Sequence, residues 1–444
     1  MTSWLDENPQ YKNIRAGAAD LNGQARGKRV PARFARKLEE DGMRFALSVL
    51  NLDIWGEDVE DSPLVFEIGD PDGVLFPTER GYVPMPWLSS PSALLPMWMY
   101  TEDGKAFGGD PRHALARVLE RYKKLGMTPV VATEMEFYLV DDSGKEIQQP
   151  ASPRSGKRRP GAEILSLRAL DAFDNFFNDL YDGCDEMGIE TEAATSEVGL
   201  GQFEINLVHV ADALRAADDA WLFKMLVRGL ARKHDMAASF MAKPYEEHAG
   251  NGMHVHFSII DKDGNNLFAN GTHEGTPLLR QAIAGCLNGI HDLALIFAPH
   301  GNSYDRLMPE SYAPTGVCWA YENRTASIRV PGGSVNARRI EHRVAGGDVN
   351  PYLFLAAVLG SALVGIEDAM TPPPPISGNA YEQDLPQIPA TWVEAIDAFE
   401  NSALVKRIFP NEMVRNLVLT KRQELHYFSE LSPGEKLDLY LDTV

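Results

Sequence analysis

The 444-residue chain is too long for one compact hydrophobic core, and its 44% hydrophobic content is that of a soluble globular protein. The net charge of −21 excludes nucleic acid as a non-specific partner, because no basic surplus exists to neutralise phosphates. The charge suits a solvated acidic surface, cationic substrates or bound metal ions.

Cysteine usage and hydropathy predict the compartment. Cys184, Cys286 and Cys318 are far apart and form no CxxC pair, which favours a reducing cytoplasm without disulfides. The N-terminal MTSWLDENPQYKN lacks the basic and apolar blocks of a signal peptide. The longest apolar run, at residues 352–366, is shorter than a membrane span and is typical of a core helix. We expect a cytoplasmic protein with no membrane partner.

The first hundred residues are predicted to form a small β-rich domain. A turn and a basic cluster in DLNGQARGKRVP (residues 20–31) precede two strand-like runs, FALSVLNLDIW (45–55) and PLVFEI (63–68). The glycine-rich TEDGKAFGGDP (101–111) is the expected boundary. We therefore predict one domain over residues 1–107 and a second over residues 108–444.

The second part of the chain mixes helical and strand-like patterns. Helices are predicted over residues 111–126 (capped by Asp110), 165–188, 211–234, 276–298 and 350–370, and at the end of the chain. Strands are predicted over residues 130–140, 191–208, 251–261, 324–331 and 338–346, with loops over 298–316 and 371–389.

Five of these strand-like segments share one pattern, with apolar residues on one face and ionisable residues on the other. In VVATEMEFYLV, for example, Glu134 and Glu136 share the face opposite Met135 and Phe137. The polar faces of the five segments carry Glu134, Glu136, Glu204, His254, His256, Ser258, Arg329, Glu341 and Arg343. One concave sheet with a polar lining would explain all five segments.

The chemistry of this face suggests metal and phosphate binding. Oxygen-rich donor sets such as Glu134, Glu136, Glu197, Glu204, His254 and Glu341 favour Mg²⁺ or Mn²⁺ over zinc. Arg306, Arg324, Arg329 and Arg343 supply planar groups suited to phosphate or carboxylate. Divalent metals beside arginines are the groups that phosphoryl transfer needs.

Each residue alone also fits a structural role: it could form a salt bridge, be a hydrogen-bonded histidine of the core, or lie on a solvent-exposed face of a strand. The repetition of one pattern in five segments favours a functional site. The sequence has no GxxxxGK[ST], GxGxxG, GxSxG or HExxH motif, so a nucleotide would bind in another way.

Six motifs, in this order, resemble the glutamine synthetase family. They are TEMEF, EVGLGQFEIN, NGMHVHFS, NSYDRLMPESYAP, ENRTASIRVP and RRIEHRVAGGDVNPYLFLAA, and they span residues 133–357. The segment DLNGQARGKRVP resembles the γ-glutamylpolyamine synthetase branch, and the final SPGEKLDLYLDTV resembles the closing helix of the family. The likeness is loosest between residues 40 and 105.

The resemblance implies an α+β fold, with a small N-terminal β-grasp domain and a catalytic domain built on a curved antiparallel sheet flanked by helices. It implies a homo-oligomer, commonly a dodecamer of two hexameric rings, with each active site between two subunits. The implied reaction is ATP-dependent: the γ-carboxylate of glutamate is phosphorylated, and an amine nitrogen then displaces the phosphate.

The resemblance also implies roles for particular residues. Glu136, Glu197 and Glu204 match the ligands of a tighter metal, and Glu134, His254 and Glu341 match those of a second metal at the ATP phosphates, two or three Mg²⁺ or Mn²⁺ ions in all. Arg306, Arg343 and Gly250 match the glutamate site, and Arg324 matches the arginine at the transferred phosphoryl group. Arg329, His256, Ser258 and Glu192 match nucleotide contacts.

The sequence departs from ammonia-using members at the ammonium site. Those members carry a glutamate immediately before Ala-Pro, where RLMPESYAP has Tyr312. A phenol with an ordinary pKa of about 10 is a poor substitute for a carboxylate. Glu310, two residues earlier, is the candidate replacement. The Asp-Gly-Ser-Ser stretch of the ammonium pocket is also missing from GDPDGVLFPTERGYVPMPW.

We therefore predict a ligase that joins glutamate to an organic amine, with a putrescine-type polyamine favoured over methylamine or ethanolamine. The alternatives are an ammonia-using glutamine synthetase, a catalytically inactive relative, and a metal-binding or phosphate-binding module without turnover. The six filled metal positions argue against an inactive relative. Arg306 and Arg343 argue against a simple binding module.

Overall fold

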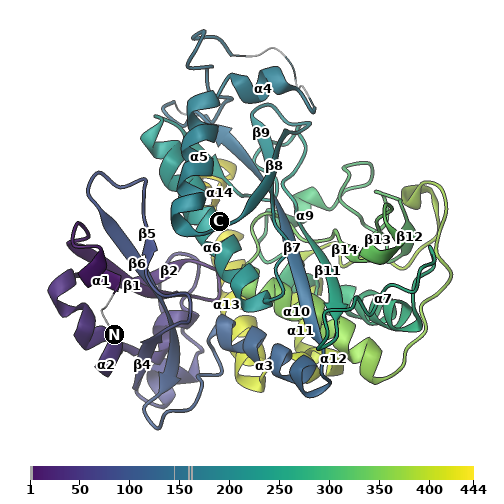
Figure 1. Ribbon diagram of the computed structural model, residues 1–444, viewed down its shortest axis with the longest axis horizontal. Coiled ribbons are helices and arrows are strands. Elements are labelled where there is room, and N and C mark those ends of the chain that lie inside the picture. The colour runs from purple at the N-terminus through teal and green to yellow at the C-terminus, as the bar shows by residue number, and fades with distance from the viewer. Residues whose placement is uncertain (1–3, 145, 159–160, 162–163) are drawn as a thin grey trace.

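The computed structural model describes residues 4–144, 146–158, 161 and 164–444. Figure 1 shows the N-terminal segment (purple) folded around its own sheet at the left, with helices between it and the long strands of a second sheet in the view. No helix in the described ranges is long and apolar enough to span a bilayer.

The N-terminal sheet has six strands in the order β2-β1-β6-β4-β3, with β5 beside β6. The strands are β1 (Asn13–Ala19), β2 (Ala25–Pro31), β3 (Met43–Ala46), β4 (Asp72–Pro77), β5 (Val83–Pro84) and β6 (Ser92–Thr101). Strands β1 and β6 are parallel, and the other pairs are antiparallel. Ile14, Leu75 and Met99 form a core with Leu38 of helix α2 (Ala35–Asp41), and the short helix α1 (Trp4–Glu7) precedes β1.

The second sheet has eight strands in the order β12-β13-β14-β11-β7-β9-β8, with β10 beside β7. They are β7 (Thr128–Val140), β8 (Thr191–Ser196), β9 (Gln202–Leu207), β10 (Ala237–Ser239), β11 (Met253–Ile260), β12 (Trp319–Tyr321), β13 (Ile328–Val330) and β14 (Ile340–His342). The two long central strands, β7 and β11, are visible at the centre of Figure 1. Their apolar residues, including Met135, Phe137, Val255 and Phe257, are buried in the main core.

Twelve further helices follow the N-terminal sheet in the described chain. They are α3 (Pro111–Lys124), α4 (Leu167–Asp171), α5 (Asp174–Met187), α6 (Ala213–Lys233), α7 (Pro277–Ile290), α8 (Ala294–Phe297), α9 (Ser303–Arg306), α10 (Pro351–Glu367), α11 (Trp392–Asn401), α12 (Ala403–Ile408), α13 (Asn411–Phe428) and α14 (Pro433–Thr443).

Helix α10 forms the centre of the helical layer. Asn350 caps it by accepting hydrogen bonds from the backbone N–H groups of Tyr352 and Leu353, and residues 351–365 are all buried. It packs closely on α7, where a Cβ on Gly285 would lie 2.1 Å from the Ser361 carbonyl oxygen. The apolar run is therefore a core helix, as the sequence predicted.

A buried ion pair joins three helices beside the N-terminal sheet. Arg112 of α3 donates to Asp218 of α6 at 3.0 and 3.1 Å, and the hydroxyl of Tyr352 in α10 donates to the same carboxylate at 2.8 Å. The guanidinium lies 4.4 Å from the ring centre of Trp98 in β6. This packing seats the N-terminal sheet against the helices.

Four sequence predictions need correction. The second sheet is mixed, because the unpredicted strand β12 runs parallel to β13. The run PLVFEI forms a helical turn, since Ser62 caps it and Pro63 takes its first position. The run FALSVLNLDIW is a strand only at its start, because β3 ends at Ala46 and residues Leu47–Asn51 form a 3-10 helix. The helix predicted over residues 165–188 is divided into α4 and α5.

Candidate active site

Four adjacent strands bring the predicted polar residues onto one face of the second sheet. Glu136 of β7 pairs with Glu204 of β9, and Glu134 pairs with His254 of β11. His256 of β11 pairs with Glu341 of β14. Because side chains alternate along each strand, these in-register partners project to the same side of the sheet.

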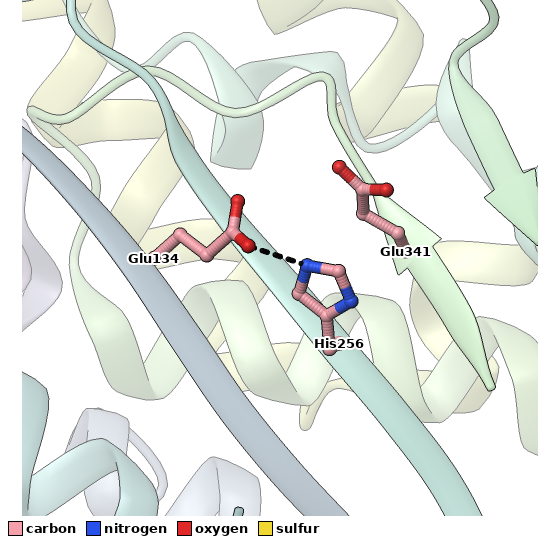
Figure 2. Close-up of side chains that lie close together, drawn as sticks. All are labelled: Glu134, His256 and Glu341. Carbon is pink, nitrogen blue, oxygen red and sulfur yellow. Dashed lines mark hydrogen bonds and ion pairs between the residues drawn. The ribbon is translucent and has the colours of Figure 1, made fainter. Parts of the chain in front are cut away.

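Glu134 is the central carboxylate of this face. Its two oxygens contact His254 Nδ1 at 3.2 Å and His256 Nε2 at 2.9 Å. Although burial opposes a charge here, the hydrogen bonds from the two imidazoles hold the pKa of Glu134 well below its usual range. Figure 2 shows Glu134, His256 and Glu341 reaching from three strands toward one space.

Two groups of donor atoms are close enough to hold a metal ion. The atoms of Glu134, His256 and Glu341 lie within 4.8 Å of one another, as do those of Glu134, Glu204 and His254. Glu134 belongs to both groups. This grouping differs from the two ligand sets implied by the family resemblance, which separate Glu134 from Glu204 and give His256 to the nucleotide.

The other end of the face has an excess of negative charge. Burial, reinforced by the charge of Glu197, raises the pKa of Glu136 to about 7. Burial and the charges of Glu134 and Glu136 raise the pKa of Glu204 to about 9. Carboxylates that are buried together without enough positive charge form a donor set that fits a divalent cation.

The predicted arginines surround these carboxylates. Arg329 donates to Glu341 at 2.6 Å, and Arg343 donates to the other oxygen of the same carboxylate. Although burial opposes the charge, Arg343 and the nearby imidazoles hold the pKa of Glu341 down to about 2. The Nε atoms of Arg329 and Arg343 are buried without a hydrogen-bond partner in the described chain, which suits an anionic ligand.

Arg306 and Arg324 lie toward the acidic end. Arg306 is 5% exposed and donates to the Val344 carbonyl at 2.8 Å, and its charge acts on Glu136. Arg324 lies in the turn before β13, and its charge acts on Glu197. Burial raises the pKa of Glu197, against the hydroxyl of Thr195 and the charge of Arg324.

The remaining predicted residues lie at the edges of this face. Gly250 packs against Arg306, because a Cβ there would lie 2.8 Å from Arg306 Cγ. Ser258 follows His256 on β11, and Glu192 is exposed on β8. Glu310 is exposed in the loop after α9, and its φ of 63° lies in the left-handed region. Within the described residues, no hydrogen bond joins Ser258, Glu192 or Glu310 to the central carboxylates.

The structure adds two residues that sequence reasoning missed. Gly252 donates its backbone N–H to Glu136 at 2.6 Å, and Arg339 Nε donates to His256 Nδ1 at 3.2 Å. Both lie inside the motifs NGMHVHFS and RRIEHRVAGG. The alternation of apolar and polar residues predicts only which side chains of a strand share a face. It therefore could not identify the backbone N–H of Gly252 or the side chain of Arg339, which precedes strand β14.

Comparison with known proteins identifies the family. Residues 108–440 match the family described as glutamine synthetase, catalytic domain. The chain belongs to the glutamine synthetase family. That family accounts for the six motifs, all of which lie inside the matched range.

Three relatives show how far the similarity extends. The γ-glutamylputrescine synthetase PuuA of Escherichia coli K12 is 36% identical over 99% of this chain and 93% of its own length. A glutamate–isopropylamine ligase of a Pseudomonas species is 33% identical over 99% of this chain and 96% of its own length. The solved structure of a GmaS–ADP complex superposes with a TM-score of 0.84, with 26% identity and 97% of both chains covered.

Proposed function

We propose that this member of the glutamine synthetase family is an ATP-dependent glutamate–amine ligase, and more narrowly a γ-glutamylpolyamine synthetase of the putrescine type. The observation that carries the proposal is the combination of a complete polar face with Tyr312 in place of the ammonium-site glutamate. The tyrosine side chain is 67% exposed and has a φ of 63°. The names of the two similar amine ligases support the same substrate class.

The proposed reaction has two steps. An oxygen of the glutamate γ-carboxylate attacks the γ-phosphorus of ATP, and ADP leaves. The amine nitrogen then attacks the γ-carbonyl carbon of the acyl phosphate, inorganic phosphate leaves, and the nitrogen loses a proton. Glu310 is the proposed acceptor for that proton, because it is an exposed carboxylate two residues before Tyr312.

The proposed roles follow the position of each residue on the face. Glu134, Glu136, Glu197, Glu204, His254 and Glu341 would hold Mg²⁺ or Mn²⁺, and the buried acidic end fits such ions. When bound, the ions would neutralise phosphate charge and position the γ-carboxylate. Arg306, Arg343 and Gly250 would bind glutamate, and Arg324 would stabilise the transferred phosphoryl group. Arg329, His256, Ser258 and Glu192 would contact the nucleotide.

The assembly and location are also proposed. We propose an N-terminal β-grasp domain over residues 1–107, a catalytic domain over residues 108–444, and a cytoplasmic dodecamer of two hexameric rings with active sites between subunits. Three buried free cysteines agree with a reducing compartment. Light scattering should give the mass of twelve 49.1 kDa chains. The mass of a single chain would contradict the ring.

A phosphate-release assay tests the reaction. Glutamate and ATP are supplied with putrescine, methylamine, ethanolamine or ammonium, and mass spectrometry identifies the γ-glutamyl product. We expect the highest kcat/KM with putrescine-type amines and the lowest with ammonium. Robust turnover with ammonium and none with any organic amine would show instead an ammonia-using glutamine synthetase, the second candidate. Glu310 favours that candidate, because it offers a carboxylate near the position occupied by Tyr312.

A further inference from the structure

A large cavity lies directly beside the candidate glutamate site. Its volume is about 920 Å³, and its lining includes Val198, Ala249, Asp305 and Glu310. Val198 follows Glu197 in the chain, Ala249 precedes Gly250, and Asp305 precedes Arg306. Three segments that carry proposed substrate or metal residues therefore also form the wall of this cavity.

The cavity lining carries more negative than positive charge. Carboxylates come from Glu246, Glu247, Asp305 and Glu310, and ammonium groups come from Lys243 and Lys436. Lys243 Nζ donates to the His248 carbonyl at 2.6 Å, so one of its hydrogens is already used by the backbone. Asp305 accepts one hydrogen bond from Asn302 at 3.2 Å. Among the described residues, none of the four carboxylates forms a salt bridge within 4.0 Å.

Part of the cavity lining is aromatic, and the ammonium group of a lysine lies against it. Phe428 and Tyr440 line the cavity, and their ring centres are 5.4 Å apart. The ammonium of Lys436 lies 4.4 Å from the Phe428 ring centre, and its charge also acts on Asp305. Lys436 is a four-carbon chain that ends in an ammonium group. An ammonium group on such a chain therefore packs against an aromatic ring in this cavity.

We propose that this cavity binds the distal ammonium group of a diamine or polyamine while the proximal amine accepts the γ-glutamyl group. The inference rests on the proposed function, because it assumes that the acceptor is an amine. Glu246, Glu247 and Asp305 supply the charge that attracts the distal ammonium, and Met308 and Leu437 line the path of the methylene chain. A monoamine of the same length lacks the group that these carboxylates recognise.

Two variants and a matched control test the proposal. The variants are Glu246→Gln with Glu247→Gln, and Asp305→Asn. The control is Glu430→Gln, since Glu430 is exposed on a segment next to the cavity but does not line it. The acceptors are 1,4-diaminobutane and n-butylamine, which share a four-carbon chain and differ by one ammonium group. Activity is measured as glutamate-dependent phosphate release.

Each variant should lower kcat/KM for 1,4-diaminobutane by about tenfold or more, the effect of losing one charge-assisted hydrogen bond. The value for n-butylamine should change by less than about twofold, as should every value for Glu430→Gln. Equal losses with both amines, or no loss with either, would overturn the proposal. A wild-type enzyme that uses both amines equally well would also overturn it, and would leave the proposed ligase activity intact.

Calorimetry separates this inference from the reaction itself. The binding of 1,4-diaminobutane is measured on the wild-type chain and on the same variants, and needs no turnover. If no amine supports phosphate release, the proposed ligase fails. Binding that weakens in the cavity variants and not in Glu430→Gln still supports the cavity assignment. Absence of binding, or binding that all variants retain, rejects it.

Discussion

Replacement of Gly252 by alanine should remove activity without unfolding the protein. The backbone of Gly252 is held by two hydrogen bonds with Glu136, one in each direction, at 2.6 and 3.1 Å. Its φ lies outside the left-handed region, so alanine is allowed there. The new Cβ would lie 2.9 Å from both Arg306 Nη2 and His254 Nε2, and 3.5 Å from Glu136 Oε2.

The size of the effect follows from these contacts. A carbon atom needs about 3.5 Å from such neighbours, so the ends of Arg306 and His254 must each move by roughly half an ångström or more. A misplacement of about 1 Å in an active site can cost about 100-fold in rate, and two side chains are displaced here. We expect kcat/KM to fall by about 100-fold, or about 2.7 kcal/mol at 1.36 kcal/mol per decade. The moving atoms are side-chain ends, so the unfolding temperature should change little.

The assay is steady-state phosphate release with glutamate varied at saturating ATP and amine, alongside thermal unfolding. Gly434→Ala is the matched control, because a Cβ at Gly434 meets nothing within 4 Å and the residue lies in helix α14. That variant should keep full activity. Wild-type kinetics in a folded Gly252→Ala protein would refute the proposed roles of Arg306 in glutamate binding and of His254 in metal binding.

Three further predictions follow from the same structure. Arg306→Lys should raise the glutamate KM by about tenfold or more, because lysine lacks the planar guanidinium that can donate two parallel hydrogen bonds to a carboxylate. An unchanged KM would exclude Arg306 from the glutamate site. Glu136→Ala should weaken Mn²⁺ binding by at least about tenfold in calorimetric titration, whereas unchanged affinity would contradict its role as a ligand. Burial, aided by Lys421 and Lys224, lowers the pKa of His300 well below its ordinary value, so the unfolded chain binds a proton at this residue more readily than the native protein does. The free energy of unfolding should therefore be unaffected by His300 above about pH 6.5 and should decrease as the pH falls below that value. His300→Phe should flatten that decline in urea unfolding between pH 7.5 and 5.5, and an equal slope in both proteins would reject the assignment.

The sequence was sufficient to predict the polar face because strand periodicity is a local property. Glu134 and Glu136 share a face in any strand conformation, and the same holds for His254 and His256. The pairing of strands is not local. That Glu136 faces Glu204, or that Glu134 reaches both histidines, depends on register, which no single segment encodes.

The missed elements are short or are determined by neighbours. Strand β12 has three residues, too few for a period of two to be recognised, and its parallel pairing with β13 is a long-range contact. PLVFEI has the apolar composition of a strand, yet the cap at Ser62 and the proline at the first position favour a helical turn. Local capping therefore outweighed β propensity at this position.

The charge distribution of the active site also explains why two acidic groups on one strand are tolerated. At the Glu134 and Glu341 end, the protein supplies its own hydrogen-bond partners and positive charge, two imidazoles to Glu134 and two arginines to Glu341, and both carboxylates have lowered pKa values. At the Glu136 and Glu204 end it supplies less, and both pKa values are raised. A cation therefore gains more free energy at the second end, where it relieves the repulsion between carboxylates that Arg306 and Arg324 offset only in part. This asymmetry supports the proposal of a tighter ion at Glu136, Glu197 and Glu204.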